Sequence, residues 1–204
     1  MPAYKLTYFD FRGLGEPIRL LLSYGGQEFE DVRMEYGGEE WQKFKPNTPF
    51  GQLPLLEFDG KQIFQHVAVA RYLAKQYKLA GDNDWEALQA DIVVDTINDL
   101  KTKLYDALWG PDPEIVKKNY EEAVKTTVPF YLEKLNALAT SGYLANGKLS
   151  WADLYFFAFI ELLESFLKET SLNDKYANLA KVRDNVLALP KVKAWVDKRP
   201  KTEY

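Results

Sequence analysis

The pattern of apolar residues changes once along the chain, at the polar segment 81–84, and few folds are compatible with that change. Before this segment, short runs rich in β-forming residues alternate with turn residues. After it, strand signals vanish and apolar residues recur every three or four positions, which is typical of amphipathic helices. The sequence therefore predicts a mixed α/β domain over residues 1–80 and an all-helical domain over residues 84–204.

The first domain is expected to begin with two strands and a helix between them. Residues 4–8 and 29–34 carry the β-forming residues of strands. The turn after Tyr8 contains two glycines and opens a helix. Pro17 is tolerated there because the first turn of a helix leaves its amides without partners in any case. These elements form a β-α-β unit.

A hairpin and a second helix complete this domain. Two short apolar runs flank Asp59-Gly60, a dipeptide that favours a tight hairpin turn. Residues 65–78 have a helical pattern, whereas residues 46–54 hold three prolines and are expected to form a shaped loop. The full order, β-α-β and then β-β-α, predicts a mixed four-stranded sheet covered by helices.

The second domain is expected to contain only helices, near residues 93–108, 114–138, 178–188 and 191–198 and after Ser150. Pro129 is expected to kink the helix that contains it. Ser150 and Asp153 have the spacing of a reciprocal capping box, with Asp where Glu is usual. Leu149 and Leu154 are placed to pack against each other across this cap. We interpret the motif as a folding signal rather than a binding site.

Cysteine is absent from the chain, and His66 is its only histidine. Structural zinc sites, iron–sulfur clusters, disulfides and cysteine nucleophiles therefore lack their ligands or their reactive group. A Ser–His–Asp triad that uses any other histidine is excluded as well. If the protein performs sulfur chemistry, the sulfur must arrive on a ligand.

Composition and charge limit the partners and the location of the protein. No apolar run approaches the ~18 residues that span a membrane, and the N-terminus shows no secretory signal. The 26 basic and 30 acidic residues form no basic stripe with interleaved aromatic residues, so nucleic acid is not an expected partner. We expect a cytoplasmic protein that binds neither membrane nor nucleic acid.

Several side chains stand where a ligand could bind, although each also has an ordinary structural explanation. Tyr8 closes the first strand, where ligands commonly sit in α/β units, but core aromatic residues are found there too. Trp41 and Lys45 share one face of a helical turn and could hold a carboxylate, or they could pack at the surface. Asp99 belongs to an acidic edge of a long helix, which is ordinarily a solvated face.

Two further segments can also be interpreted either as part of a binding site or as ordinary structure. Gln65 and His66 begin a helix whose amides suit an anion, or their side chains cap that helix. Pro54, which follows Gln52 and Leu53, could form a cis bond that turns the Leu53 backbone outward. By frequency alone, a trans bond is the expected form.

In this order, the segments resemble the cytosolic glutathione transferases, and most closely the arthropod members of the sigma class. The matching segments are YKLTYFDFRGLGEPIRLLL, EYGGEEWQKFKPNTPFGQLPLLEFDGK, FQHVAVARYLAKQYKLAG, IVVDTINDL, GKLSWADLYF and LPKVKAWVDKRPKTEY. The resemblance covers essentially the full length. It implies a thioredoxin-like N-terminal domain, an all-helical C-terminal domain, a homodimer, and a cis bond before Pro54.

The resemblance also implies a catalytic residue and a site for glutathione. Tyr8 corresponds to the tyrosine whose hydroxyl donates a hydrogen bond to the glutathione sulfur. The positions that correspond to other contacts with the tripeptide are Trp41 and Lys45 at the glycyl end, Gln52, Leu53 and Pro54 at the cysteinyl part, and Gln65 and His66 at the γ-glutamyl part. Asp99 corresponds to an acidic residue that reaches the γ-glutamyl amine from the other subunit. The electrophile is expected to bind near Phe9, Leu14, Tyr105 and Trp109.

Three residues depart from the pattern of the family. His66 stands where a serine hydroxyl usually helps to hold the γ-glutamyl carboxylate. Leu14 replaces an arginine that vertebrate prostaglandin D synthases of this class place beside the sulfur. Asn98 interrupts the acidic cluster with which those enzymes recruit a divalent metal. We therefore expect weaker and more pH-dependent glutathione affinity, little prostaglandin isomerase activity and no metal requirement.

The resemblance implies an enzyme that activates the thiol of glutathione for attack on hydrophobic electrophiles such as lipid-peroxidation aldehydes. A thioredoxin-like domain without cysteine cannot exchange disulfides, which fits a domain that binds a thiol instead. Two alternatives stay open: a glutathione-dependent prostaglandin-type isomerase, and a non-catalytic transferase-like protein with a ligand-binding or structural role.

Overall fold

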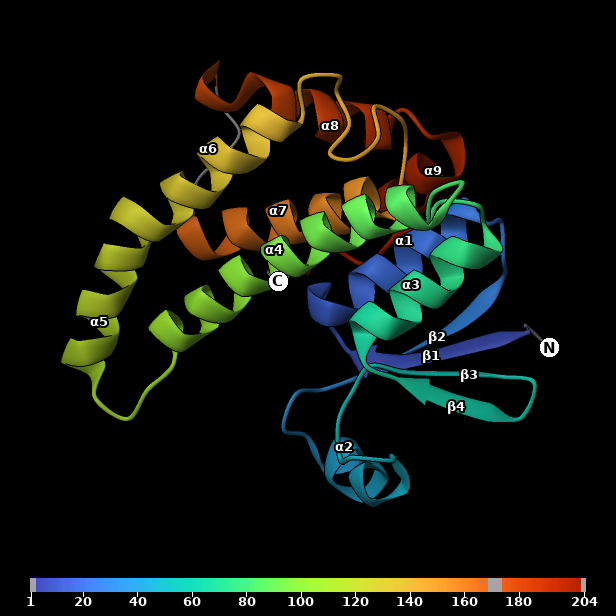
Figure 1. Cartoon of the computed structure of the whole chain (residues 1–204). Coiled ribbons are helices and arrows are strands. Elements are labelled where there is room, and N and C mark those ends of the chain that lie inside the picture. Colours follow the sequence, from blue (N-terminus) through green and yellow to red (C-terminus); the bar gives the residue numbers. More distant parts are fainter. Residues whose placement is uncertain (1–2, 169–173, 203–204) are drawn as a thin grey trace. The chain divides into compact units, whose positions relative to one another are not determined.

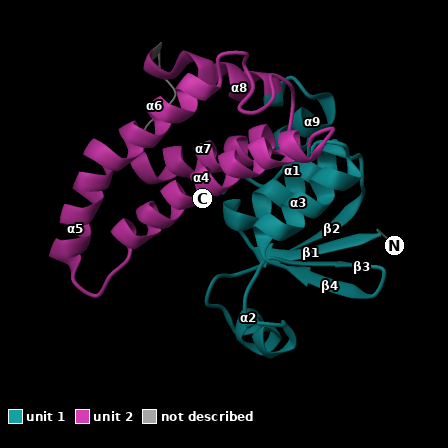
Figure 2. Ribbon diagram, viewed as in Figure 1, with its two compact units in different colours: residues 1–80, 186–204 teal, residues 81–185 magenta. Residues whose placement is uncertain are grey.

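The structure, a computed structural model, describes residues 3–168 and 174–202 (Figure 1). The chain divides into two compact units, Met1–Ala80 with Val186–Tyr204, and Gly81–Asn185 (Figure 2). The C-terminal segment therefore belongs to the first unit. All strands within the described ranges lie in that unit. No helix in the same ranges is both long and apolar enough to cross a membrane.

The first unit is built on a four-stranded mixed sheet. Its strands are β1 (Tyr4–Phe9), β2 (Phe29–Met34), β3 (Leu55–Phe58) and β4 (Lys61–Phe64), in the spatial order β2-β1-β3-β4. β1 runs parallel to β2 and antiparallel to β3, and β3 and β4 form the predicted hairpin. Asp59 and Gly60 both have positive φ, of 49° and 71°, which suits the tight turn between these strands. The predicted thioredoxin-like sheet is confirmed.

The described part of this unit contains the helices α1 (Glu16–Tyr24), α2 (Glu39–Phe44), α3 (His66–Gln76) and α9 (Pro190–Lys198). Helix α1 contacts both α3 and α9, and every residue from Glu16 to Leu22 is buried. The predicted loop over residues 46–54 is irregular except at its start, where Lys45–Asn47 form a 3₁₀ turn. The Lys45 carbonyl accepts bonds from the amide and the hydroxyl of Thr48, which close this turn.

The second unit is helical, as predicted. Its elements are α4 (Asp84–Leu108), α5 (Pro113–Glu122), α6 (Val128–Leu138), α7 (Trp151–Leu167), a short 3₁₀ turn (Asp174–Tyr176) and most of α8 (Ala177–Leu187). Helix α4 packs against α5 and α7. Helix α7 has twelve buried residues out of 17, spread around its whole circumference. A helix that is apolar on all sides has to be buried, so α7 forms the centre of this unit.

The predicted helix over residues 114–138 is divided by a π-helical turn, Ala123–Thr127. Pro129 follows this turn in the first turn of α6. It has no N–H to donate to the carbonyl four residues earlier, and its ring would clash with that carbonyl in a regular helix. The irregularity predicted at Pro129 is therefore present, as a widened turn just before the proline.

The predicted capping box at the start of α7 is confirmed. The Asp153 carboxylate accepts bonds of 2.8 Å from the backbone N–H groups of both Ser150 and Leu144. Asp153 is completely buried. It therefore stabilises the first turn of α7 and also ties that turn to the loop before it.

Candidate active site

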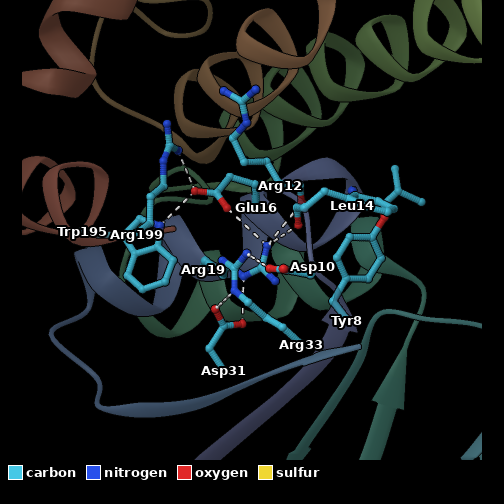
Figure 3. Close-up of polar contacts among 11 residues, drawn as sticks. Tyr8, Asp10, Arg12, Leu14, Glu16, Arg19, Asp31, Arg33, Trp195 and Arg199 are labelled. Atoms are coloured by element: carbon cyan, nitrogen blue, oxygen red, sulfur yellow. Dashed lines mark hydrogen bonds and ion pairs between the residues drawn. The ribbon is translucent and has the colours of Figure 1, made fainter. Parts of the chain in front are cut away.

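Tyr8 lies near the C-terminal end of β1, and only 4% of it is exposed. Its hydroxyl accepts a hydrogen bond of 3.0 Å from the backbone N–H of Leu14, in the 3₁₀ turn Gly13–Gly15 that precedes α1 (Figure 3). A phenol can accept such a bond through a lone pair and donate its own hydrogen to an acceptor. Because the accepted N–H polarises the oxygen, it makes the hydroxyl a stronger donor.

The turn after β1 closes directly on the Tyr8 ring. A Cβ added at Gly13 would lie 2.7 Å from the Tyr8 hydroxyl, and one at Gly15 would lie 2.6 Å from Tyr8 Cδ1. Gly13 also has a φ of +39°, in the region that glycine adopts most readily. The two glycines therefore allow the backbone to approach the tyrosine where side chains would not fit. The Arg19 guanidinium is also near, 5.7 Å from the centroid of the Tyr8 ring.

Tyr8 belongs to an apolar cluster that holds other predicted site residues. Its buried members are Tyr8, Phe9, Met34, Trp41, Leu53 and Leu55, and Leu14 packs against them. Phe9 contacts the rings of both Tyr8 and Trp41, each at a centroid separation of 5.4 Å. The structure thus brings the predicted catalytic residue together with parts of the predicted glutathione and electrophile sites.

Trp41 and Lys45 come from α2 and from the turn that follows it. Trp41 is 7% exposed, whereas Lys45 is exposed. The Lys45 ammonium lies 6.0 Å from the centroid of the Trp41 ring, within the range of a cation–π contact. The lysine stem passes Gly51, where a Cβ would be 3.3 Å from Lys45 Cε. An ammonium group that is held against an aromatic ring and a glycine is suited to bind a carboxylate ligand.

A pocket of about 140 Å³ shares Leu14 and Leu53 with the apolar cluster. The residues that line it are Leu14, Phe50, Gln52, Leu53, Pro54, Phe64, Gln65 and His66. The peptide bond between Leu53 and Pro54 is cis, so the form that the resemblance implies is confirmed. Six predicted site residues therefore line one pocket, with the polar Gln52 and Gln65 exposed at its surface.

Gln65 and His66 form the N-terminus of α3, where the backbone is strained. Gln65 has a φ of 69° and a ψ of 91°, a combination that residues other than glycine rarely adopt. Strain of this kind is often found at binding sites. The Gln65 side chain does not cap α3, so its explanation as a helix cap is wrong. The positive end of the α3 dipole therefore adjoins the pocket.

Three predicted site residues belong to the second unit. Asp99 is exposed on α4, and Tyr105 and Trp109 form a T-shaped pair with centroids 5.2 Å apart. Burial raises the pKa of Tyr105 to about 12. The roles of these residues stay predictions. In the described ranges, no group of three or more His, Cys, Asp or Glu side chains is placed to hold a metal.

Two buried charged residues near Tyr8 escape prediction from the sequence. The side chains of Glu16 and Arg19 are both 0% exposed, and Arg19 Nη1 donates to the carbonyls of Phe11 and Arg12, at 2.9 and 3.3 Å. The signal that could reveal the pair lies in the segment EPIRLLL. It holds two opposite charges three positions apart within an otherwise apolar stretch, a spacing that places them on one helix face.

Comparisons with known proteins give a consistent result. Residues 4–75 match the family described as glutathione S-transferase, N-terminal domain, and residues 98–199 match glutathione S-transferase, C-terminal domain. A glutathione S-transferase of Anopheles gambiae is 46% identical, with 100% of both chains covered. A hematopoietic prostaglandin D synthase of Gallus gallus is 41% identical over 99% of both chains. The solved structure of prostaglandin synthase D of Nilaparvata lugens is 47% identical, with a TM-score of 0.92 over 98% of this chain and 100% of that one.

Proposed function

Because the chain belongs to the glutathione S-transferase family, we propose that it uses Tyr8 to activate the thiol of glutathione and transfers the tripeptide to hydrophobic electrophiles. Glutathione is the co-substrate of this family. Aldehydes formed by lipid peroxidation are the electrophiles that we expect. The observation that carries the proposal is the Tyr8 hydroxyl, which accepts the Leu14 N–H at the edge of a buried apolar cluster.

One hydrogen bond from Tyr8 can supply most of the activation that the thiol needs. A cysteine thiol ordinarily titrates near ~8.5, so only a few per cent is ionised at pH 7. Lowering that pKa by about two units requires ~2.7 kcal/mol of preferential stabilisation of the thiolate. A well-aligned hydrogen bond to a charged group contributes ~1.5–3 kcal/mol. The thiolate then attacks a carbon atom of the electrophile and forms a carbon–sulfur bond. In an unsaturated aldehyde the carbon–carbon π bond breaks and a proton from water completes the adduct, whereas in a substitution the leaving group departs with its electron pair.

The cysteinyl and glycyl parts of glutathione are assigned to residues of the first unit between Trp41 and Pro54. We assign the Leu53 backbone to the cysteinyl peptide groups, with Gln52 and Pro54 beside it in the pocket. The glycyl carboxylate is assigned to Lys45, whose ammonium lies over the Trp41 ring. A carboxylate there would gain a charge-assisted hydrogen bond.

The γ-glutamyl part is assigned to the start of α3. Gln65 and His66 line the pocket at that point, and the amides of a helix N-terminus favour a carboxylate. Phe9, Leu14, Tyr105 and Trp109 stay proposed contacts of the electrophile. We expect no divalent metal requirement, because Asn98 interrupts the acidic edge of α4, and we propose a cytoplasmic location.

We also propose a homodimer in which Asp99 of α4 reaches the γ-glutamyl amine bound by the partner subunit. The support is an apolar stripe on α4: Trp85, Leu88 and Ile92 are 67%, 47% and 48% exposed. Exposed apolar patches are typical of protein–protein interfaces. Sedimentation of the wild type tests the dimer, and a raised KM for glutathione in Asp99→Asn tests the contact.

A glutathione-dependent prostaglandin isomerase is the second candidate. The similarity to the prostaglandin D synthases of Gallus gallus and Nilaparvata lugens favours it. Leu14 counts against it, since an apolar side chain there cannot replace the cation expected beside the sulfur. A prostaglandin endoperoxide, offered beside a panel of electrophiles, separates the two candidates by their relative rates.

Ultraviolet difference absorbance of the thiolate, recorded as glutathione is added, tests the leading proposal. We expect a thiolate signal near neutral pH in the wild type and none in Tyr8→Phe. The conjugation rate of this variant should be ~10–100-fold lower than that of the wild type. Binding without a thiolate signal would indicate a carrier, and no binding would indicate a structural protein. An endoperoxide isomerised faster than any electrophile is conjugated would favour the isomerase.

A further inference from the structure

A row of charges of alternating sign runs through the first unit and begins at Arg199, directly after α9 (Figure 3). Its members, in order, are Arg199, Glu16, Arg19, Asp31, Arg33 and Asp10, and the successive nitrogen–oxygen distances are 2.7, 3.3, 2.9, 2.8 and 3.2 Å. Trp195 of α9 adds a bond of 2.8 Å from its indole Nε1 to Glu16. The row therefore joins the two ends of the chain around Glu16.

Glu16 lies inside this row without contact with solvent, since its side chain is 0% exposed. Burial acts to raise the pKa of the Glu16 carboxyl, but the charges of Arg19 and Arg199 and the bond from Trp195 more than offset it. The pKa is therefore held below its ordinary value, and Glu16 is ionised at neutral pH. Without this charge, the buried Arg19 and the partly buried Arg199 would lose the counter-ion that they share.

The row reaches the Tyr8 hydroxyl through one short turn. Arg19 Nη1, the nitrogen that contacts Glu16, also donates to two backbone carbonyls of the turn, at 2.9 and 3.3 Å. Farther along the same turn, the backbone N–H of Leu14 donates to the Tyr8 hydroxyl at 3.0 Å. The alignment of this N–H with the hydroxyl therefore depends on where Arg19 is held.

We propose that Glu16 is a positioning residue for Tyr8. By holding Arg19, it aligns the Leu14 amide with the tyrosine hydroxyl. Through the bonds that it accepts from Trp195 of α9 and from Arg199 directly after α9, it also makes this alignment depend on the C-terminal helix. The inference rests on the proposed role of Tyr8 in activating glutathione.

The expected consequence is a change in thiol acidity rather than in glutathione binding. A misaligned Leu14 amide would polarise the Tyr8 oxygen less, so the hydroxyl would donate a weaker bond to the sulfur. The thiol of bound glutathione would then ionise at higher pH. Glu16 is not among the contacts proposed for the tripeptide, so the KM for glutathione should change little. High pH should restore the rate, because the thiol then ionises without help.

Three variants separate this role from a purely structural one. Glu16→Gln removes the charge at nearly constant shape. Trp195→Phe removes one hydrogen bond to Glu16 and keeps an aromatic ring next to Phe29. Lys193→Gln, on the same helix, breaks only an exposed ion pair with Asp197 and serves as the control.

Two measurements are made on each variant. The first is the pH profile of the rate at saturating glutathione, and the second is hydrogen exchange of the Leu14 amide without glutathione. In Glu16→Gln and Trp195→Phe, we expect the thiol pKa to rise by about 0.5–1 unit. The rate at pH 6.5 then falls about 3–10-fold and recovers to within about twofold of wild type at pH 9. The Leu14 amide should exchange faster in both variants and as in wild type in the control.

A rate that falls by the same factor at every pH would overturn the proposal, and so would a Leu14 amide that exchanges as in wild type. Trp195→Phe decides between these outcomes even if Glu16→Gln does not fold. Tyr8→Phe tests the proposed function separately. If that variant leaves the thiol pKa unchanged, Tyr8 is not the activating group, whereas Leu14 exchange still decides whether Glu16 holds the turn.

Discussion

Gly15 lies so close to the Tyr8 ring that a Cβ at this position would be 2.6 Å from Tyr8 Cδ1. The φ of Gly15 is −79°, which any residue adopts, so an alanine there meets a steric clash and no backbone strain. Gly15→Ala should therefore displace the Tyr8 ring, to which we assign the activation of glutathione. We expect a loss of ~10–100-fold in kcat/KM and of ~1–3 kcal/mol in the free energy of unfolding.

Gly60→Ala is the matched control for this change. Its φ of +71° strains an alanine by ~1 kcal/mol, but nothing lies within 4 Å of the added Cβ. It should lose stability and keep wild-type kinetics, as measured by urea unfolding and by steady-state assays with one electrophile. Full activity in Gly15→Ala would mean that the position of the Tyr8 ring does not limit catalysis.

Lys45 is exposed and lies over Trp41. We predict that Lys45→Met raises the KM for glutathione by ~5–20-fold and leaves kcat within about twofold of wild type. The reason is that a contact with the glycyl carboxylate stabilises the bound substrate and the transition state equally. The difference should shrink at high salt, since exposed charges are screened.

Lys43→Met is the control for Lys45→Met. Lys43 is exposed too; it lies on α2, and its ammonium pairs with Glu39 at 3.3 Å. Its loss removes the same charge two positions before Lys45, so KM should stay at the wild-type value. Equal increases in KM for both variants would show that net charge matters and that Lys45 has no specific contact.

The features that local sequence patterns predict are those whose contacts are close in the chain. The hairpin at Asp59-Gly60 depends on two residues with positive φ, and the capping box joins Ser150 to Asp153 three positions later. Each residue type has a known preference for its role. Pro129 marks the limit of such signals. It predicts an irregular helix, but it does not specify the form of the irregularity, which in the structure is a π-turn rather than a simple kink.

In the candidate site, too, some residues can be identified from the sequence and others cannot. The resemblance identifies Tyr8, Trp41 and Leu53 because each belongs to a short motif, and the structure brings them into one cluster. The resemblance does not reveal the hydrogen bond between Glu16 and Trp195, two residues that are 179 positions apart in the chain. Contacts between residues so far apart in the chain depend on how the whole unit packs. The only local signal for them is the pair of opposite charges, Glu16 and Arg19, within an otherwise apolar helix.

His66 is half-buried and lines the pocket at the start of α3. We predict that His66→Ser lowers the KM for glutathione at pH 8 by about 3–10-fold, because a compact hydroxyl can donate to the γ-glutamyl carboxylate. An imidazole ordinarily gains a proton near pH ~6.5 and then attracts a carboxylate. The KM of the wild type should therefore fall as pH drops, while that of the variant stays flat. Superimposable KM curves from pH 6 to 8 would refute this.

Asp153 is buried between two backbone N–H groups. Desolvation by burial raises its pKa to about 6, although these bonds oppose the shift. An aspartate in the unfolded chain titrates near ~3.9, so the folded protein holds this proton more tightly. The contribution of this group to stability is therefore fully present below the unfolded pKa and is lost as pH rises through about 6.

Asp153→Asn removes both the titration and one acceptor, because an amide nitrogen cannot accept the bond that Ser150 or Leu144 donates. At pH 7, we expect the variant to be less stable than wild type by ~1–3 kcal/mol. This gap should widen by a further ~1–3 kcal/mol between pH 7 and pH 4, since only the wild type takes up the proton. Urea unfolding at each pH measures the gap, and Asp197→Asn, at an exposed position on α9, should differ little from wild type throughout. A gap that narrows on acidification would show that the folded protein favours the carboxylate, and the direction of the shift would be wrong.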